Sequence, residues 1–250
     1  MTAWRIGGYS ALVCGTLVLW QVVHLIAGAN LVSGPADVLA RAVELAESGK
    51  LQENLAISAA RLAIGWVIGC TLAVPLGLAM AQIPIVRRAV EPYLHFFRFI
   101  PPIAFVSLAL IWFGIGEMSK IVLIIYTTSF TVTIATLSGA LSVRREAVWA
   151  AKSLGASATQ IPFVVIVPAT LPSIITGVRL AMGTAFKTII GAEMIGAKSG
   201  LGFMIWDARG FLDFETIFVG IVALAVMGLF ADWLLRTALR PVSIRYGIAV

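Results

Sequence analysis

Long apolar runs separated by short polar segments dominate this chain of 250 residues. About 20 apolar residues in a helix cover the hydrocarbon core of a bilayer, so these runs predict membrane-crossing helices. The third run is short and follows a break at Pro101 and Pro102. The predicted spans are residues 9–27, 62–81, 102–115, 121–143, 171–192 and 217–235. The pattern therefore predicts an all-α polytopic membrane protein with about six transmembrane helices.

Two other segments follow different patterns. Residues 35–53 place apolar side chains at helical spacing opposite charged ones, which predicts an amphipathic surface helix. The segment after the fifth span contains Gly196, Gly200 and Gly202 and is predicted to be a pliable loop.

The composition agrees with a membrane protein. Hydrophobic residues make up 60% of the chain, charged residues 12%, and the mean hydropathy is +1.00. Soluble domains carry about 25% charged residues. Residues 1–250 are therefore predicted to form a single transmembrane domain with short loops and no appended soluble domain.

The basic residues predict the orientation. With the N-terminus inside, ten of the 18 basic residues fall in inner segments and five in outer ones, as the positive-inside rule requires. Both termini and the loop that starts at Trp149 are then cytoplasmic. The inner residues are Arg5, Arg87, Arg88, Arg98, Arg144, Arg145, Lys152, Arg236, Arg240 and Arg245, and the outer ones are Arg41, Lys50, Lys120, Lys198 and Arg209.

The sequence lacks the common motifs of nucleotide-binding and catalytic sites. The Gly49-Lys50 pair lacks the other residues of a phosphate-binding loop, and no zinc-protease motif or nucleophile elbow occurs. His24 and His95 are isolated. The chain is therefore predicted not to be an enzyme, to hold no metal or cofactor, and not to bind nucleic acid.

Charged residues inside the spans require a reason, because an ionised side chain at mid-depth costs about 2.5–3.5 kcal/mol or more. Arg61 is interpreted as snorkelling at the end of its span, and Asp232 as pairing with Arg236 one turn away. Arg179 and Lys187 lie two turns apart on one face of the fifth span. Together with Glu193 they are candidates for lining a translocation path, which would favour an anionic or zwitterionic solute; structural pairing with carbonyls or acids is the alternative.

The most distinctive segment is polar and lies between two spans. Its small residues Ala150, Ala151, Gly155 and Ala156 are followed by an aliphatic closure at Pro168, within a loop of about residues 144–168. This pattern resembles the "EAA" loop of binding-protein-dependent ABC importer permeases. Further residues are similar to the nitrate/sulfonate/taurine/bicarbonate branch of that family: Phe99-Ile100-Pro101-Pro102, Ile111 to Gly116, Ala192 to Ile195 and Ser199 to Gly202.

The resemblance implies a type I importer fold in the bacterial cytoplasmic membrane. Two permease copies would form the pore, a cytoplasmic ATPase dimer would bind ATP and Mg²⁺, and a periplasmic or lipid-anchored protein would deliver the solute. It also implies that the loop forms a coupling helix that contacts the ATPase. One departure is that Trp149 replaces the Glu that opens the family motif, although Glu146 lies one turn earlier.

Two other classes of protein remain open at this point. A stand-alone channel or secondary transporter would need its own coupling charges and, usually, an inverted repeat, and the sequence shows no such repeat. A structural assembly subunit would not need the Gly-punctuated loop. Co-purification of an ATPase subunit would separate these classes from an importer permease.

Overall fold

The longest apolar runs fold as helices with the length and hydropathy of membrane spans. The computed structural model describes residues 2–28 and 31–246, with the backbone alone for residues 2–11 and Ser243. Four helices meet the requirement for a span, and each overlaps a predicted one: α3 (Lys50–Gln82), α6 (Glu117–Leu141), α8 (Val167–Gly196) and α10 (Phe214–Arg245). The described residues contain helices and connecting turns but no strand, which confirms the all-α prediction.

The first and third predicted spans are less regular. Helix α1 (Thr2–Ala27) supplies a shorter apolar stretch, Leu12–Ala27. The third run forms a 3₁₀ turn, η1 (Pro102–Phe105), and α5 (Val106–Phe113). Helix α4 (Pro84–Phe97), which the hydrophobic pattern did not predict, precedes them and is bent by 93° relative to them. The pair would give a fifth crossing, so the count of six is approximate.

Four short elements complete the chain. They are α2 (Pro35–Glu47), α7 (Arg145–Ser153), the π turn η2 (Pro162–Ile166) and α9 (Leu201–Gly210). Helix α2 confirms the predicted amphipathic helix but ends earlier, at a turn where Gly49 has φ +77°. The prediction of a pliable loop after the fifth span was wrong for residues 201–210, which form α9.

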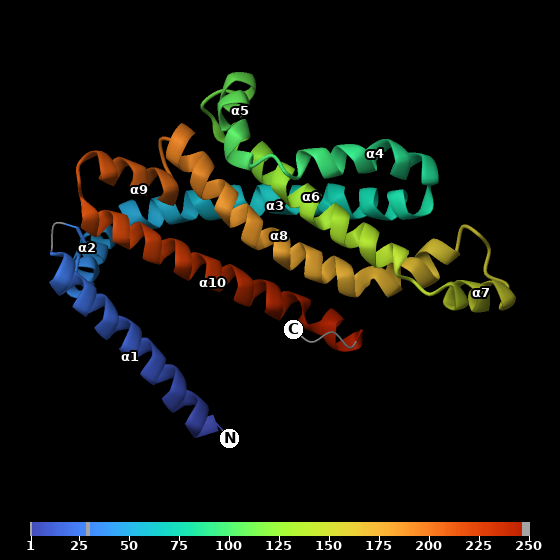
Figure 1. The fold of residues 1–250 in the computed structure, drawn as a ribbon, viewed down its shortest axis with the longest axis horizontal. Helices are drawn as coiled ribbons and strands as arrows, with labels where there is room; N and C mark the ends of the chain where they lie inside the picture. The colour runs from blue at the N-terminus through green and yellow to red at the C-terminus, as the bar shows by residue number, and fades with distance from the viewer. Residues whose placement is uncertain (1, 29–30, 247–250) are drawn as a thin grey trace.

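Small residues bring the central helices together. Helices α3, α6 and α8 lie side by side (Figure 1). A Cβ on Gly65 would lie 2.7 Å from Ile124 Cβ, and one on Gly69 would lie 2.7 Å from Thr128 Cβ. Such close backbone approach is typical of helix packing in membranes, where dispersion contacts replace the hydrophobic effect.

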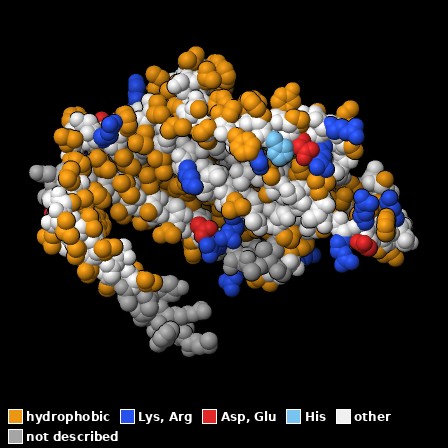
Figure 2. All heavy atoms as spheres, in the orientation of Figure 1, with side chains coloured by type: hydrophobic (Ala, Val, Ile, Leu, Met, Phe, Trp, Pro, Cys, Tyr) orange, Lys and Arg blue, Asp and Glu red, His pale blue; other side chains and the backbone are white. Residues whose placement is uncertain are grey.

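The two ends of the bundle differ. Helices α2 and α9 lie at one end and α7 at the other, while α1 leans away from the central helices (Figure 1). Lys and Arg side chains gather at the α7 end (Figure 2). The bundle therefore has a basic end that carries the loop singled out by the sequence.

Candidate functional site

The segment at residues 144–168 forms a short exposed helix and a sharp turn. Glu146, Ala150 and Ala151 lie on α7, none of whose residues is buried. Gly155 has φ +90°, a conformation that side chains with a Cβ rarely adopt. Its N–H donates to the Lys152 carbonyl at 2.9 Å, and the Ala156 N–H donates to the Ala151 carbonyl at 3.0 Å. The predicted helix with a glycine exit turn is thus confirmed in its backbone geometry.

The return from α7 into the bundle passes through a π turn. The Val167 N–H donates to the Pro162 carbonyl, five residues earlier, which is the hydrogen bond of a π turn. Pro168 follows at once and has no N–H, so it cannot donate an α-helical bond to the Val164 carbonyl. Pro168 lies in the first turn of α8. Pro172 lies inside α8, which begins at Val167. Residues 154–166 thus connect α7 to the central helix α8.

A cavity of about 670 Å³ opens between α6, α8 and the segment before α5. Its lining contains two cations, Arg98 and Lys187, and the described residues around it include no acid. The remaining polar side chains bear hydroxyl groups, and aromatic rings also line the cavity. These residues are Thr127, Thr131, Thr184, Thr188, Tyr126, Phe99 and Phe130. The cavity therefore combines positive charge, hydroxyl groups and apolar surface.

A second cavity of about 480 Å³ lies between α8 and α10 and shares Lys187 with the first. Arg179 also lines it and donates to Asp232 Oδ1 at 3.4 Å. Arg236 Nε donates to Asp232 Oδ2 at 2.7 Å, which confirms the predicted pair. Arg179 and Lys187, both on α8, thus line the second cavity, and Lys187 lines the first cavity as well.

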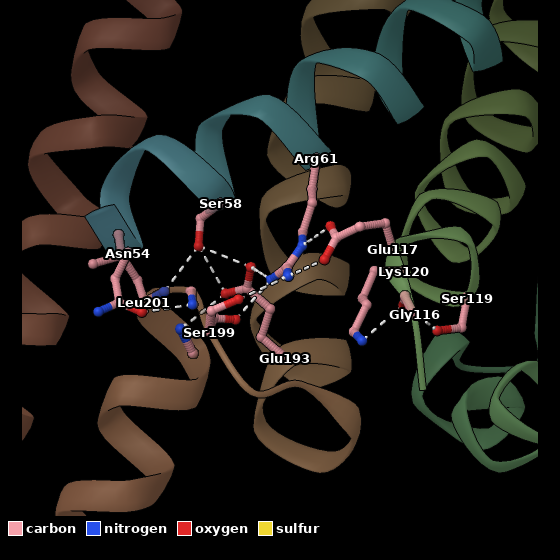
Figure 3. A network of polar contacts seen from close by, with 12 residues as sticks. Asn54, Ser58, Arg61, Gly116, Glu117, Ser119, Lys120, Glu193, Ser199 and Leu201 are labelled. Atoms are coloured by element: carbon pink, nitrogen blue, oxygen red, sulfur yellow. Dashed lines mark hydrogen bonds and ion pairs between the residues drawn. The ribbon is translucent and has the colours of Figure 1, made fainter. Parts of the chain in front are cut away.

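A buried polar network joins the central helices near the α9 end (Figure 3). Arg61 on α3 is 3% exposed and donates to Glu193 of α8 at 2.8 Å. The same guanidinium makes a two-pronged contact with Glu117 at the start of α6 and donates to the Ser199 carbonyl at 2.7 Å. The interpretation of Arg61 as a snorkelling residue was therefore wrong, because its charge is held inside the bundle by two carboxylates.

Glu193 organises the turn between α8 and α9. Its side chain is fully buried and accepts hydrogen bonds from Ser58 at 2.8 Å and from the Gly202 N–H at 2.9 Å. Gly200 has φ +110°, and a Cβ there would collide with the Glu193 carboxylate. The Ala192 to Ile195 and Ser199 to Gly202 motifs noted in the sequence thus fold against each other.

The expected path residues divide into two groups. Arg179 and Lys187 line cavities, whereas Glu193, expected with them, lies in the buried network and lines neither of the two cavities described above. Lys120, expected in an outer loop, is 2% exposed on α6, where it donates to the Gly116 carbonyl at 2.9 Å. The roles of Ser58 and Glu117 were missed, because their partners are distant in the sequence.

A smaller ion pair joins α2 to α10. Arg41 Nη2 donates to Asp213 Oδ2 at 2.8 Å, and Asp213 caps α10 by accepting from the Thr216 N–H at 3.0 Å. Burial alone would raise the pKa of the Asp213 carboxyl, but the hydrogen bonds from Thr216 and Arg41 outweigh it and hold that pKa below its ordinary value. The carboxylate form of Asp213 therefore stabilises this contact.

The apolar helices and the exposed α7 that ends at a glycine turn match the fold that the sequence resemblance implies. The chain belongs to the family described as "Binding-protein-dependent transport system inner membrane component", which matches residues 73–241. It is accordingly a multi-pass inner membrane protein and the permease component of an ABC transporter. This confirms the resemblance seen in the sequence.

Named relatives agree with this assignment. A probable ABC transporter permease of Brucella melitensis is 42% identical, covering 86% of this chain and 88% of its own. The taurine transport system permease of Escherichia coli K12 is 34% identical, covering 98% and 93%. Permeases named for aliphatic sulfonates in Bacillus subtilis and for nitrate in a Synechocystis strain are also similar.

The fold also matches a solved structure. A chain of the MetNI methionine ABC transporter in inward facing conformations superposes with a TM-score of 0.62, covering 76% of this chain and 97% of that one. Its sequence is only 16% identical, so the likeness concerns the fold alone. The fold is that of a type I ABC importer permease.

Proposed function

We propose that this chain forms the translocation path of an ATP-driven importer for a small anionic or zwitterionic solute of the taurine, alkanesulfonate, nitrate or bicarbonate type. The observation that carries the proposal is the cavity bounded by Arg98 and Lys187, whose described lining contains no acid. Two cations beside a low-dielectric wall raise the local concentration of anions. The relatives named for taurine, aliphatic sulfonates and nitrate support the same solute class.

In the orientation that we propose, the α7 end of the bundle lies in the cytoplasm. The basic side chains gathered at that end support this assignment through the positive-inside rule (Figure 2). Both chain termini are then cytoplasmic; the terminal residues themselves, Met1 and residues 247–250, lie outside the described part. The Arg61 network and the α2–α9 surface face the periplasm.

The partners supply the energy and the solute. Two copies of the chain enclose the path, a periplasmic or lipid-anchored binding protein delivers the solute, and a cytoplasmic ATPase dimer binds ATP and Mg²⁺. This chain holds no cofactor and does no bond chemistry, so hydrolysis belongs to the ATPase. The family and the relatives' names support such an assembly.

Coupling runs from α7 to the cavity. The contact surface comprises Glu146, Ala150, Ala151, Gly155 and Ala156, and Pro168 begins the return into α8. When the ATPase dimer closes, it moves α7, and the connection transmits the movement to α8. Because α8 carries Arg179 and Lys187, the movement changes the side to which the cavity opens, which is alternating access by a two-state element.

Uptake by the reconstituted transporter tests the proposed path. Lys187→Met should slow ATP-driven uptake of a labelled anionic solute about 10-fold or more, because the cavity loses half of its positive charge. Lys198→Met is the matched control, since Lys198 is exposed outside the cavity. Uptake is expressed per folded complex. Equal rates for the two variants would refute the role of Lys187 in the path.

A further inference from the structure

Helix α7 presents a large aromatic side chain that the described part of the chain leaves uncovered. Trp149 is 59% exposed, and Leu154, just beyond the helix, is 89% exposed. In a protein that crosses a membrane, exposed apolar side chains usually face lipid. Trp149 instead lies on a helix beyond the ends of α6 and α8 (Figure 1), and that helix also carries Arg145, Glu146 and Lys152.

Charged residues are regularly spaced on either side of Trp149 along α7. Arg145, Trp149 and Lys152 follow the i, i+4, i+7 spacing, so they lie in one row along the helix. Arg144 adds a third exposed cation, and Glu146 is the one carboxylate of the segment. The surface is an aromatic side chain flanked by positive charge along the helix.

This arrangement fits a protein pocket better than a bilayer surface. A helix that lies on a membrane needs a continuous apolar face. The large apolar residues of α7 are only Val148, which is half-buried against the chain, and Trp149, whose neighbours along the row are charged. A single buried Trp ringed by charged residues is instead the usual form of an anchor in a protein interface.

We propose that Trp149 is the apolar anchor by which this permease selects its ATPase subunit. The partner carries an apolar pocket for the indole and carboxylates on the rim that pair with Arg145 and Lys152. This inference rests on the proposed function and specifies the chemistry of the partner surface. Arg144 pairs with Glu146 at 3.6 Å, which leaves Arg145 and Lys152 as the charges that an acidic, indented partner surface would complement.

Binding of the ATPase subunit to the full-length chain in lipid nanodiscs tests the anchor. The probe is the recombinant ATPase of the same transporter, recognised by its phosphate-binding loop. Trp149→Ala should weaken binding about 10-fold or more, Trp149→Phe should largely retain it, and Trp149→Glu should weaken it further by placing a carboxylate against the acidic rim. Trp233→Ala is the matched control, because Trp233 is also 59% exposed but lies on the membrane-spanning helix α10.

The results distinguish a failure of the Trp149 anchor from a failure of the proposed function. If wild-type chain binds the ATPase but Trp149→Ala or Trp149→Glu binds equally tightly, the anchor is refuted and the proposed function stands. If the wild-type chain binds no ATPase, both fail. A photo-reactive phenylalanine analogue at position 149 should crosslink to an ATPase peptide containing apolar and acidic residues. Crosslinking to lipid alone, or to a second copy of this chain, would overturn the inference.

Discussion

At the scale of single residues, the charges inside the bundle have two different functions. Arg61 and Glu193 are almost fully buried and satisfy one another, which is how ionised groups persist away from water. Lys187 is exposed to two cavities and Arg179 is only partly enclosed. The sequence places Arg179 and Lys187 inside a predicted span and Arg61 and Glu193 beside the ends of spans. It does not pair Arg61 with Glu193, because the two are 132 positions apart.

The buried pair leads to a prediction about stability. Arg61→Met should lower the free energy of unfolding in mixed micelles by about 3–5 kcal/mol, because it leaves the Glu193 charge buried and without its cation. Glu117→Gln should cost much less, since the Glu117 side chain is 60% exposed and water can replace its contact. Chemical unfolding of both purified variants checks this. Equal losses would show that Arg61 is not stabilised chiefly by Glu193.

The contact between Arg41 and Asp213 predicts a pH dependence. A carboxyl whose pKa is lower in the folded state contributes stability above its ordinary pKa of 3.8 and loses that contribution as the pH falls through the lowered pKa. Asp213→Asn keeps a capping oxygen but removes the charge, so it should cost about 0.5–1 kcal/mol near neutral pH. The difference between variant and wild type in thermal unfolding should shrink as the pH falls below that ordinary value. A difference that stays constant with pH would contradict the assignment.

At the scale of helices, apolar length was a sufficient guide to α3, α6, α8 and α10. It failed for α4 and α9, because these helices mix charged and apolar residues. Arg87 and Glu91 interrupt α4, and Asp207 and Arg209 interrupt α9, so neither shows the continuous apolar run of a span. Helix α7 was found only through its Ala residues and the Gly155 that follows it, since it is too short for hydropathy to reveal.

Close helix packing predicts the cost of an added side chain. Gly77→Val should prevent stable folding or lower the unfolding temperature strongly, because a Cβ there would lie 2.7 Å from Thr136 Cβ and 2.9 Å from the Thr133 carbonyl oxygen. Gly183→Val, also inside a long helix, is the control, since a Cβ there meets no atom within 4 Å. Thermal unfolding followed by size-exclusion chromatography measures both. A similar loss in the two variants would show that the α3–α6 contact is not tightly packed.

At the scale of the whole molecule, the orientation decides which end meets the ATPase. The single-cysteine variants Ser142→Cys and Lys198→Cys, in a background with Cys14 and Cys70 replaced, carry their thiols at exposed positions toward opposite ends of the bundle. In intact cells the Lys198→Cys variant should react with an impermeant thiol reagent, and the Ser142→Cys variant only with a permeant one. The reverse labelling would place α7 outside and contradict the coupling account.

The most direct test of the central claim is uptake by proteoliposomes that contain this chain, its ATPase and its binding protein. The account predicts that a labelled anionic solute accumulates above its external concentration only when ATP is hydrolysed and all three components are present. The purified chain alone should neither hydrolyse ATP nor move the solute. Solute flux through the chain without the ATPase would instead identify a stand-alone channel or secondary transporter and contradict the account.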